Sequence, residues 1–484
     1  MQVPWPTNFQ EDTALTSSPE IYRPWQVPAP ASCPRILYYV KLSRDLSAIQ
    51  SEFIRVRTNA LIDKAAAECI SDDALQHFKT YKYSSVDKSP VSNHILRHYW
   101  NACVEFLPLW LAPNMVTLLG FFFVIGNVGL MELMDPDLDG PEQSWVYYSY
   151  AFGVWAYSTM DNIDGKQARR TGTSSGLGEL FDHGIDSLNC TLASLLETSA
   201  MALGATKIGA LTALIPTLPM FFSTWETYHT HTLFLGYFNG PTEGLMIASA
   251  IMLASGFYGP QIWHKPMSDV VGFEEQLGSW SVKDVWAVLL LVAFFVGHLP
   301  SCVYNVVDAR RAKGLPIAPV FLEWVPMAVF SGALVAWLGS PYSALLADNH
   351  LCLLCLTLSF VFGRMTTKTI LAHLTRQPYP YWTVLIVPLI GGAVLVNLPY
   401  LGLPAVSARS EYLYLWGYFF LSMVVYFRWA FLVINAICDY LGIECLTIPE
   451  EKWRSLQRQQ QSSAASEQIA RERSLSSQEK GKSA

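Results

Sequence analysis

Residues 161–186, DNIDGKQARRTGTSSGLGELFDHGID, place four aspartates between two long apolar segments. Asp161 and Asp164 are spaced i, i+3 at the end of the first segment, and Asp182 and Asp186 are spaced i, i+4 at the start of the second. Residues three or four apart lie on one face of a helix. The short stretch between the two pairs predicts two antiparallel neighbouring helices, so the four carboxylates are expected to converge on one point.

Four carboxylates at the edge of a hydrocarbon layer require a compensating partner. A carboxylate in a spanning helix costs roughly 2.5–3.5 kcal/mol on insertion scales. The basic residues between the two pairs, Lys166, Arg169 and Arg170, are too few to neutralise them. Divalent cations such as Mg²⁺ take oxygen ligands and are commonly completed by substrate phosphates. We therefore predict two divalent cations here; the alternative is a solvated acidic loop, which the helical spacing argues against.

The residues between the acidic pairs suit a ligand that carries phosphate. Gly165, Gly172, Gly176 and Gly178 would let the backbone approach a phosphate closely. Arg169 can donate two parallel hydrogen bonds to the same group. A phosphorylated substrate is therefore expected beside the metal ions.

The composition is that of a membrane protein. Of the 484 residues, 51% are hydrophobic and 15% are charged, against about 25% charged in soluble domains. A span needs about 20 mostly apolar residues, and such segments occur near residues 113–133, 144–163, 184–204, 208–228, 241–259, 284–306, 320–339, 349–371, 381–400 and 412–437. The predicted fold class is all-α, a polytopic helical membrane protein with about ten transmembrane helices in a lipid bilayer. This composition and the net charge of −7 exclude a nucleic-acid-binding chain.

The two ends differ from the middle of the chain. Residues 1–74 are predicted to form a polar arm followed by cytosolic or interfacial helices, residues 75–448 the membrane-embedded domain, and residues 449–484 a disordered tail. Ten spans place both tails on one side of the membrane. Loops on that side carry more basic residues, namely Lys166, Arg169, Arg170, Arg310, Arg311, Lys313 and Arg376 against Lys207, Lys265, Lys283 and Arg409. The positive-inside rule therefore predicts cytosolic tails and a cytosolic acidic cluster.

The acidic motif resembles the signature of the CDP-alcohol phosphotransferase family without departure. It runs Asp161-Asn-Ile-Asp164-Gly165-Lys-Gln-Ala168-Arg169, eight residues, Gly178, three residues, Asp182, three residues, Asp186. The surrounding sequence is similar to the eukaryotic choline/ethanolamine phosphotransferase branch, in which a histidine follows the third aspartate, here His183. Residues 108–120 and 224–244 carry further similarity, and the likeness covers about residues 75–448.

This resemblance implies a reaction, a cofactor and a place in the cell. The expected reaction transfers phosphocholine or phosphoethanolamine from CDP-choline or CDP-ethanolamine to diacylglycerol, releasing CMP and forming phosphatidylcholine or phosphatidylethanolamine. The expected cofactors are two Mg²⁺ or Mn²⁺ ions held by Asp161, Asp164, Asp182 and Asp186. The expected location is the membrane of the endoplasmic reticulum or the Golgi, with a homodimer as one form the protein could take.

The family's CDP-contacting positions also map onto this chain. They correspond to Asn114, Thr117, Gly165, Ala168, Arg169 and Gly178. Pro113 and Asn114 mark the start of the first span, so a helix N-cap is the competing account of Asn114.

Two residues are candidates for the base that takes the proton of the diacylglycerol hydroxyl. Asp186 is one, but a bound metal lowers the proton affinity of its ligands. His183 lies three residues earlier on roughly the same helix face, and imidazole titrates near neutral pH. We predict His183 as the catalytic base, with Asp186 as the alternative and a purely structural histidine as the non-catalytic account.

The headgroup is predicted to meet residues of the 224–244 segment. Trp225, Glu226, Tyr228 and Glu243 could hold a quaternary or primary amine by cation–π contact and by charge. The alternative is that they are ordinary residues of the membrane rim. Because both amines are cations, the sequence leaves the choice between choline and ethanolamine open.

Three other functions compete with this one. A related enzyme with an inositol or glycerophosphate acceptor would keep the signature, but such enzymes are typically shorter. A polytopic transporter would tend to show broken helices in paired halves, which the sequence lacks. A non-catalytic scaffold would be expected to have lost at least one aspartate, and none is lost.

Overall fold

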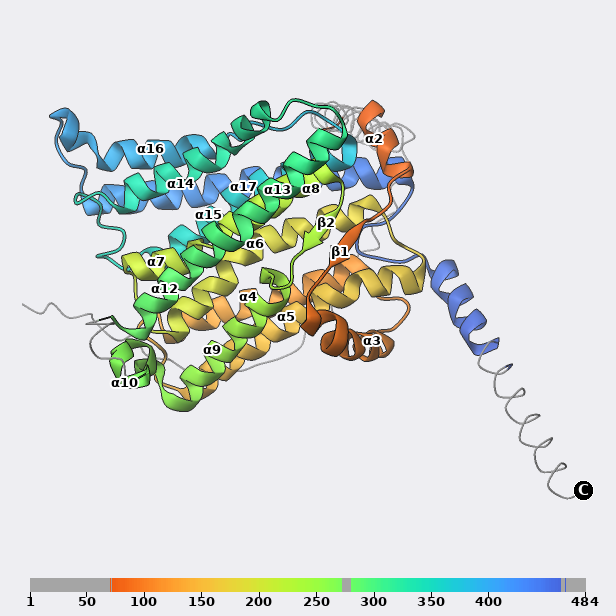
Figure 1. The fold of residues 1–484 in the computed structure, drawn as a ribbon, viewed down its shortest axis with the longest axis horizontal. Coiled ribbons are helices and arrows are strands. Elements are labelled where there is room, and N and C mark those ends of the chain that lie inside the picture. Colours follow the sequence, from red (N-terminus) through yellow and green to blue (C-terminus); the bar gives the residue numbers. More distant parts are fainter. Residues whose placement is uncertain (1–69, 71, 272–279, 463–465, 467–484) are drawn as a thin grey trace, which may run out of the picture. The chain divides into compact units, whose positions relative to one another are not determined.

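The structure is a computed structural model, and it describes residues 70, 72–271, 280–462 and 466. The predicted polar arm and nearly all of the predicted N-terminal helices lie outside these residues. The described part of the chain is mostly helical, as predicted (Figure 1).

Helices of very different length follow one another along the chain. The first half contains α2 (Asp72–Lys79), α3 (Arg97–Phe106), α4 (Pro113–Met134), α5 (Ser144–Thr171), α6 (Gly176–Ala200), α7 (Lys207–Leu214), α8 (Thr217–Thr230) and α9 (Leu245–Tyr258). The second half contains α10 (Met267–Val271), α12 (Val282–Val292), α13 (Leu299–Ala312), α14 (Val325–Leu338), α15 (Leu351–Thr375), α16 (Ile386–Val396) and α17 (Ala408–Leu441). Short π or 3-10 turns join or extend them: η1 (Ser92–Leu96), η2 (Gly240–Gly244), η3 (Pro260–His264), η4 (Ala293–His298), η5 (Ala318–Trp324) and η6 (Leu398–Leu401). Strands β1 (Ser85–Asp87) and β2 (Leu233–Leu235) pair in parallel.

Each predicted span overlaps a helix, but not every helix meets the requirements of a span by itself. Six stretches of the described chain are long and apolar enough: Pro113–Met134, Lys207–Thr230, Val282–Ala312, Ala318–Leu338, Leu351–Thr375 and Ala408–Leu441. α5 and α6 are long enough but carry the charged residues of the motif, and α16 has 11 residues. The chain is an integral membrane protein, and the number of ten spans stays a prediction.

α5 continues further through the motif than predicted. It ends at Thr171, so Gly165, Arg169 and Arg170 lie in its last turns and not in a connecting loop. No residue before Gly172 breaks the helix. Gly172 has a φ of 61°, the left-handed conformation in which glycine commonly ends a helix.

α6 begins at Gly176 and not near residue 184 as predicted. The side chain of Ser175 accepts a hydrogen bond from the backbone N–H of Gly178 and caps the helix. Asp182 and Asp186 therefore lie in the second and third turns of α6. This places them inside the packed protein, because α6 contacts α4, α5 and α15.

The helices differ in how much of their surface is covered. In the most apolar 18-residue stretch of α15, 72% is buried inside the protein, whereas in the most apolar 18-residue stretch of Val282–Ala312, which includes α12 and α13, 17% is buried. The uncovered side chains on α12, α13 and α17 are mostly apolar, for example Leu289, Tyr304 and Phe431. Lipid tails would cover these faces in a bilayer, whereas α6 and α15 form the interior.

Gly392 allows α16 to pack closely against α14. A Cβ at this position would overlap the ring of Trp337. Trp337 is fully buried, and its Nε1 donates a hydrogen bond to Oε1 of Glu411 at 2.7 Å, so the ring cannot move away without losing that bond. Gly392→Ala should therefore destabilise the protein by about 1–3 kcal/mol through overpacking. Thermal unfolding of the detergent-solubilised protein measures the effect.

Gly332→Ala in α14 is the matched control for this substitution. No atom lies within 4 Å of a Cβ at Gly332, and alanine is favoured over glycine in a helix interior. Its Tm should stay the same or rise. Equal Tm values for the two variants would show that the contact between Gly392 and Trp337 is not tight.

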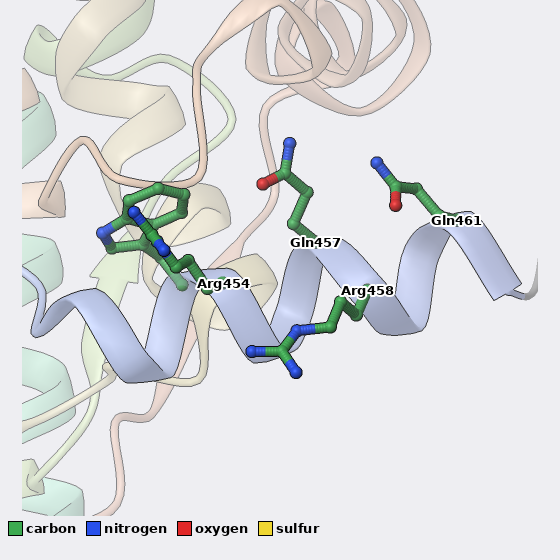
Figure 2. A pocket seen from close by; sticks show the side chains of 5 residues that line it. Arg454, Gln457, Arg458 and Gln461 are labelled. Atoms are coloured by element: carbon green, nitrogen blue, oxygen red, sulfur yellow. The ribbon is translucent and has the colours of Figure 1, made fainter.

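Only the first part of the predicted disordered tail lies within the described residues, and this part is helical. Residues 450–462 form a helix, although most of its side chains are exposed. Arg454, Gln457, Arg458 and Gln461 project from this helix and, with Trp453, line a pocket (Figure 2). All five lining residues belong to this one helix, and none of them is a residue of the acidic motif, so this pocket is separate from the candidate site.

Candidate active site

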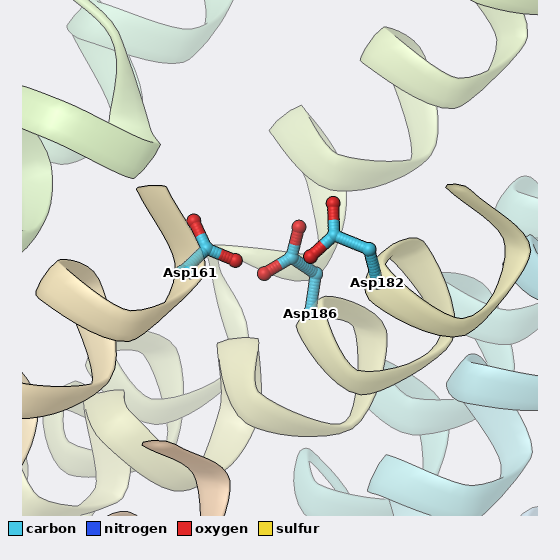
Figure 3. A group of neighbouring side chains, drawn as sticks. All are labelled: Asp161, Asp182 and Asp186. Atoms are coloured by element: carbon cyan, nitrogen blue, oxygen red, sulfur yellow. The ribbon is translucent and has the colours of Figure 1, made fainter. Parts of the chain in front are cut away.

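Three carboxylates of the motif converge between α5 and α6. Asp161 on α5 and Asp182 and Asp186 on α6 point toward one another (Figure 3). Each offers an oxygen, and these oxygens lie within 4.8 Å of one another. Oδ1 of Asp161 and Oδ1 of Asp182 are buried and have no hydrogen-bond partner among the described residues. A cation would satisfy these oxygens, and a set of carboxylate ligands suits Mg²⁺ or Mn²⁺.

The fourth predicted ligand, Asp164, is buried beside this group but does not belong to it. Its Oδ2 accepts a short hydrogen bond from Oγ1 of Thr117 on α4. Thr117 was predicted to contact the CDP group. In the structure it links the first turns of α4 to the acidic motif.

Asp186 has a partner that the sequence analysis missed. The hydroxyl of Tyr157 on α5 donates a short hydrogen bond to Oδ1 of Asp186 on α6. Tyr157 is 2% exposed and lies four residues before Asp161, on the same face of α5. That spacing is the signal that could have identified it.

His183 is oriented by the backbone of its own helix. The residue is buried, and its Nδ1 lies 3.2 Å from the carbonyl oxygen of Glu179. A carbonyl oxygen only accepts, so Nδ1 carries the hydrogen in this contact, and a neutral ring then has its lone pair on Nε2. This tautomer can accept a proton at Nε2.

Asn114 faces the motif from the first turn of α4. Its Nδ2 donates a hydrogen bond to the carbonyl oxygen of Cys445 at 3.0 Å. Its Oδ1 would lie 3.7 Å from a Cβ placed on Gly178. The N-cap residue of α4 is Ala112 and not Asn114. The competing account of Asn114 as a helix N-cap is therefore wrong.

The predicted phosphate-binding residues of α5 lie on its last turns. Gly165 and Ala168 are partly exposed, and Arg169 is exposed. Nη1 of Arg169 would lie 3.6 Å from a Cβ on Gly165, so the guanidinium folds back along α5 to the turn that follows Asp164. Within the described residues it forms no ion pair.

Two other polar residues of the motif hold the segment before α4. Nε2 of Gln167 donates to the carbonyl oxygens of Pro108 at 2.9 Å and of Leu111 at 3.0 Å. Nη1 of Arg170 donates to the carbonyl oxygen of Leu107 at 2.6 Å. Arg170 is therefore engaged with the backbone and does not face the acids as a counter-charge.

Comparison with known proteins agrees with the motif. Residues 110–273 match the family described as CDP-alcohol phosphatidyltransferase. Cholinephosphotransferase 1 of Saccharomyces cerevisiae is 39% identical over 331 residues, which cover 64% of this chain and 80% of the relative. Choline/ethanolaminephosphotransferase 2 of Arabidopsis thaliana is 32% identical over 77% of this chain and 97% of the relative. An uncharacterised family member of Schizosaccharomyces pombe is 34% identical over 78% of this chain and 97% of the relative.

The chain belongs to the CDP-alcohol phosphatidyltransferase family. The resemblance predicted from the motif is confirmed, and the protein is an enzyme of the CDP-alcohol phosphotransferase type. Enzymes of this family are metal-dependent, in agreement with the acidic cluster of this chain.

The predicted headgroup residues of this CDP-alcohol phosphotransferase are all engaged within the protein. Trp225 is fully buried, and its Nε1 donates to Oε2 of Glu323 at 2.8 Å. Oε1 of Glu226 accepts a hydrogen bond from Nδ2 of Asn305, and the hydroxyl of Tyr228 donates to the carbonyl oxygen of Gln377 at 3.0 Å. A contact with the headgroup stays a prediction for these three residues.

Glu243 is not on the helix that carries the other three headgroup candidates. It lies in η2, where Oε1 accepts a short hydrogen bond from Oγ of Ser89 and Oε2 accepts one from the backbone N–H of Asn239 at 2.9 Å. The bond from Ser89 connects η2 to the segment before η1, and the bond from Asn239 is made within η2 and its N-cap. Its role toward the headgroup likewise stays a prediction.

Tyr83, just before β1, is a further residue near the carboxylates that the sequence analysis missed. Although 53% of the residue is exposed, partial burial raises the pKa of its hydroxyl to about 12, and the charges of Asp182, Asp161 and Asp164 act in the same direction. A tyrosine hydroxyl is protonated at neutral pH even without this shift, so that of Tyr83 can donate a hydrogen bond at this site. No local pattern marks Tyr83, because β1 and the motif are distant in sequence.

Proposed function

We propose that this protein transfers phosphocholine, phosphoethanolamine or both from the CDP-alcohol to diacylglycerol, with release of CMP. The observation that carries the proposal is the convergence of Asp161, Asp182 and Asp186 within an intact family motif. The relatives that are named for an activity are cholinephosphotransferases and choline/ethanolaminephosphotransferases, and they match over most of their length. These names favour diacylglycerol over an inositol or glycerophosphate acceptor.

The proposed metal site holds two Mg²⁺ or Mn²⁺ ions on Asp161, Asp164, Asp182 and Asp186. Such ions, when bound, polarise the phosphorus under attack and neutralise charge on the departing CMP. The hydroxyls of Thr117 and Tyr157 keep Asp164 and Asp186 oriented through their hydrogen bonds. Hydrogen bonds of this kind reduce the motion of the carboxylates and so keep the site in place before the substrate arrives.

The proposed base is His183, which accepts the proton of the diacylglycerol hydroxyl at Nε2. The contact between Nδ1 and the carbonyl oxygen of Glu179 holds the ring in the required tautomer. Asp186 is the second candidate, but it already accepts the Tyr157 hydroxyl and lies among the proposed metal ligands.

The proposed CDP-alcohol contacts are Asn114, Thr117, Gly165, Ala168, Arg169 and Gly178. Arg169 is the cation available to a phosphate oxygen, because it is exposed and folds back along α5. Gly178 lies opposite Asn114, whose Oδ1 would be 3.7 Å from a Cβ at this position, so residues of α4 and α6 can meet the same ligand.

We also propose that the enzyme resides in the endoplasmic reticulum or Golgi with its active site and both tails in the cytosol. The distribution of basic residues between loops supports this orientation. A cytosolic site would give direct access to soluble CDP-alcohols.

An assay of the purified protein with parallel substrates tests the proposed function. The protein is incubated with diacylglycerol and Mg²⁺, with CDP-choline in one reaction and CDP-ethanolamine in another, and CMP and the product lipid are quantified. We expect equal amounts of CMP and phospholipid with at least one of the two donors. Replacing diacylglycerol with inositol or glycerophosphate is the control. CMP release that requires one of these alternative acceptors would overturn the proposal.

A further inference from the structure

The chain that follows α17 crosses the beginning of α4 and the end of α5. We name residues 443–452 the C-terminal strap. Thr447 pairs with Leu111, just before α4, in an isolated antiparallel bridge. Ile448 is 7% exposed, and Nζ of Lys452 donates to the carbonyl oxygen of Gly172 at the end of α5 at 2.8 Å. The strap is therefore attached to residues next to α4 and α5, which are two of the three helices that carry residues of the candidate site.

Two residues before the bridge at Thr447, the strap contacts Asn114. The carbonyl oxygen of Cys445 accepts a hydrogen bond from Nδ2 of Asn114 at 3.0 Å, and the Cys445 sulfur lies 3.5 Å from the same nitrogen. A carbonyl oxygen accepts only, so this bond fixes which end of the amide faces the strap. Oδ1 of Asn114 is consequently directed toward Gly178 on α6.

The same turn of α4 connects this contact to the acidic motif. Thr117, three residues after Asn114, donates its hydroxyl to Asp164. The strap is thus hydrogen-bonded to Asn114 and the motif on α5 to Thr117, and α4 itself joins these two residues. A shift of the strap would change the orientation of Asn114 first, without directly touching the three converging carboxylates.

We propose that the C-terminal strap forms one wall of the CDP-alcohol site, and that the main-chain carbonyl of Cys445 is a positioning group that fixes the Asn114 amide for the nucleotide. This proposal rests on the proposed function, because it takes Asn114 as a contact of the CDP group. If the strap only stabilised the fold, nucleotide would not change the labelling of its residues. A substitution in the strap would then also not change the KM for one substrate more than for the other.

Chemical labelling of Cys445 tests whether nucleotide occupies the space beside the strap. Cys445 is a free, partly buried cysteine. A hydrogen bond from the Cys438 thiol lowers the pKa of the Cys445 thiol against the opposing effect of burial, and the contact with Asn114 also lowers it, so Cys445 can be labelled with N-ethylmaleimide. We expect saturating CDP-choline with Mg²⁺ to slow its labelling by roughly tenfold or more, as mass spectrometry of the cysteine-containing peptide would show, and diacylglycerol to have little effect.

Cys103 on α3 provides the internal reference, because it is also partly buried but packs in a different cluster. Its labelling rate should not respond to nucleotide. Equal labelling of Cys445 with and without CDP-choline, in protein that turns over CDP-choline, would overturn the proposal. Protection requires binding only, so a protein that is protected but transfers nothing to diacylglycerol would contradict the proposed reaction and not the strap.

A kinetic comparison separates positioning from stability. Ile448→Ala removes the buried anchor of the strap, and it should raise the KM for the CDP-alcohol by roughly tenfold while kcat and the KM for diacylglycerol stay within about twofold. Deletion of residues 455–484, beyond the strap, is the matched control and should leave all constants within about twofold, because this polar segment has no apolar face to dock. An unchanged KM for the CDP-alcohol in Ile448→Ala, or an equal loss for both substrates, would show that the strap is only structural.

Discussion

Asp182→Ala should abolish turnover while the protein remains folded. The carboxylate of Asp182 is one of three that converge between α5 and α6, and its Oδ1 has no hydrogen-bond partner within the described chain. Loss of one preorganised electrostatic group in an active site typically costs about 10²–10³ in kcat, and loss of a metal ligand should cost at least this much. The fold should persist, because removing one of several adjacent like charges relieves their repulsion. Release of CMP and thermal unfolding, measured together, separate the two effects.

Metal removal should give the same loss in the unmodified enzyme. Excess EDTA should stop CMP release, and Mg²⁺ or Mn²⁺ should restore it. A divalent cation should also raise the Tm of the wild-type protein, since a ligand that binds only the native state stabilises it, and this rise should be absent in Asp182→Ala. Asp139→Ala, in an exposed loop away from the motif, is the control and should keep both activity and the metal-dependent Tm. Full activity in excess chelator would refute the metal site.

His183→Ala should lower kcat by about 10²–10⁴, the usual range for a general acid–base group. The structure gives the physical reason, because the contact of Nδ1 with the Glu179 carbonyl leaves Nε2 as the proton acceptor. His183 does not belong to the cluster that Asp161, Asp182 and Asp186 form. Binding of CDP-choline and the metal-dependent rise in Tm should therefore be nearly unchanged. Single-turnover kinetics with diacylglycerol at saturation, beside equilibrium binding of CDP-choline, measure both quantities.

Asp186→Asn distinguishes the two candidate bases. If Asp186 acts as a metal ligand, its substitution should weaken metal and CDP-alcohol binding as well as turnover. If Asp186 is the base, the asparagine variant would bind metal and nucleotide normally and still fail to react, while His183→Ala would stay active. A His183→Ala protein that retains more than about a third of wild-type kcat lies outside the general-base range and returns the role to Asp186.

Much of this arrangement could be predicted from the sequence, because local spacing determines it. The i, i+4 pair of Asp182 and Asp186 does converge with Asp161, since a helix places such residues on one face, whereas Asp164, the i, i+3 neighbour of Asp161, is bound to Thr117 instead. The same rule applied one turn earlier would have found Tyr157. The prediction failed where the residues after Asp164 were placed on a connection between two helices: they lie inside α5, because one glycine costs a helix only about 1 kcal/mol and Lys166, Gln167 and Ala168 are good helix formers.

Contacts between distant segments could not be predicted from the sequence. Asn114 and Cys445 are 331 residues apart, so no periodicity or motif relates them. Residue type also does not reveal whether a side chain is already engaged. Trp225 suited a cation-binding pocket by its chemistry, but its ring is fully buried and its N–H is bound to Glu323.

The absence of α5 and α6 from the six apolar spans has a consequence for how the chain is made. As each helix leaves the ribosome it must partition from the insertion machinery into lipid, and charged residues oppose this step by up to roughly 3 kcal/mol each at mid-bilayer. α5 and α6 carry all four motif aspartates and are joined by residues 172–175. Within the described chain, α6 packs against α4, which precedes it, and closely against α15, which is synthesised much later, so the acids gain part of their shielding from lipid only once α15 has been made. The pair should therefore enter the bilayer as a hairpin against α4, and nascent chains that end before α15 should be prone to degradation.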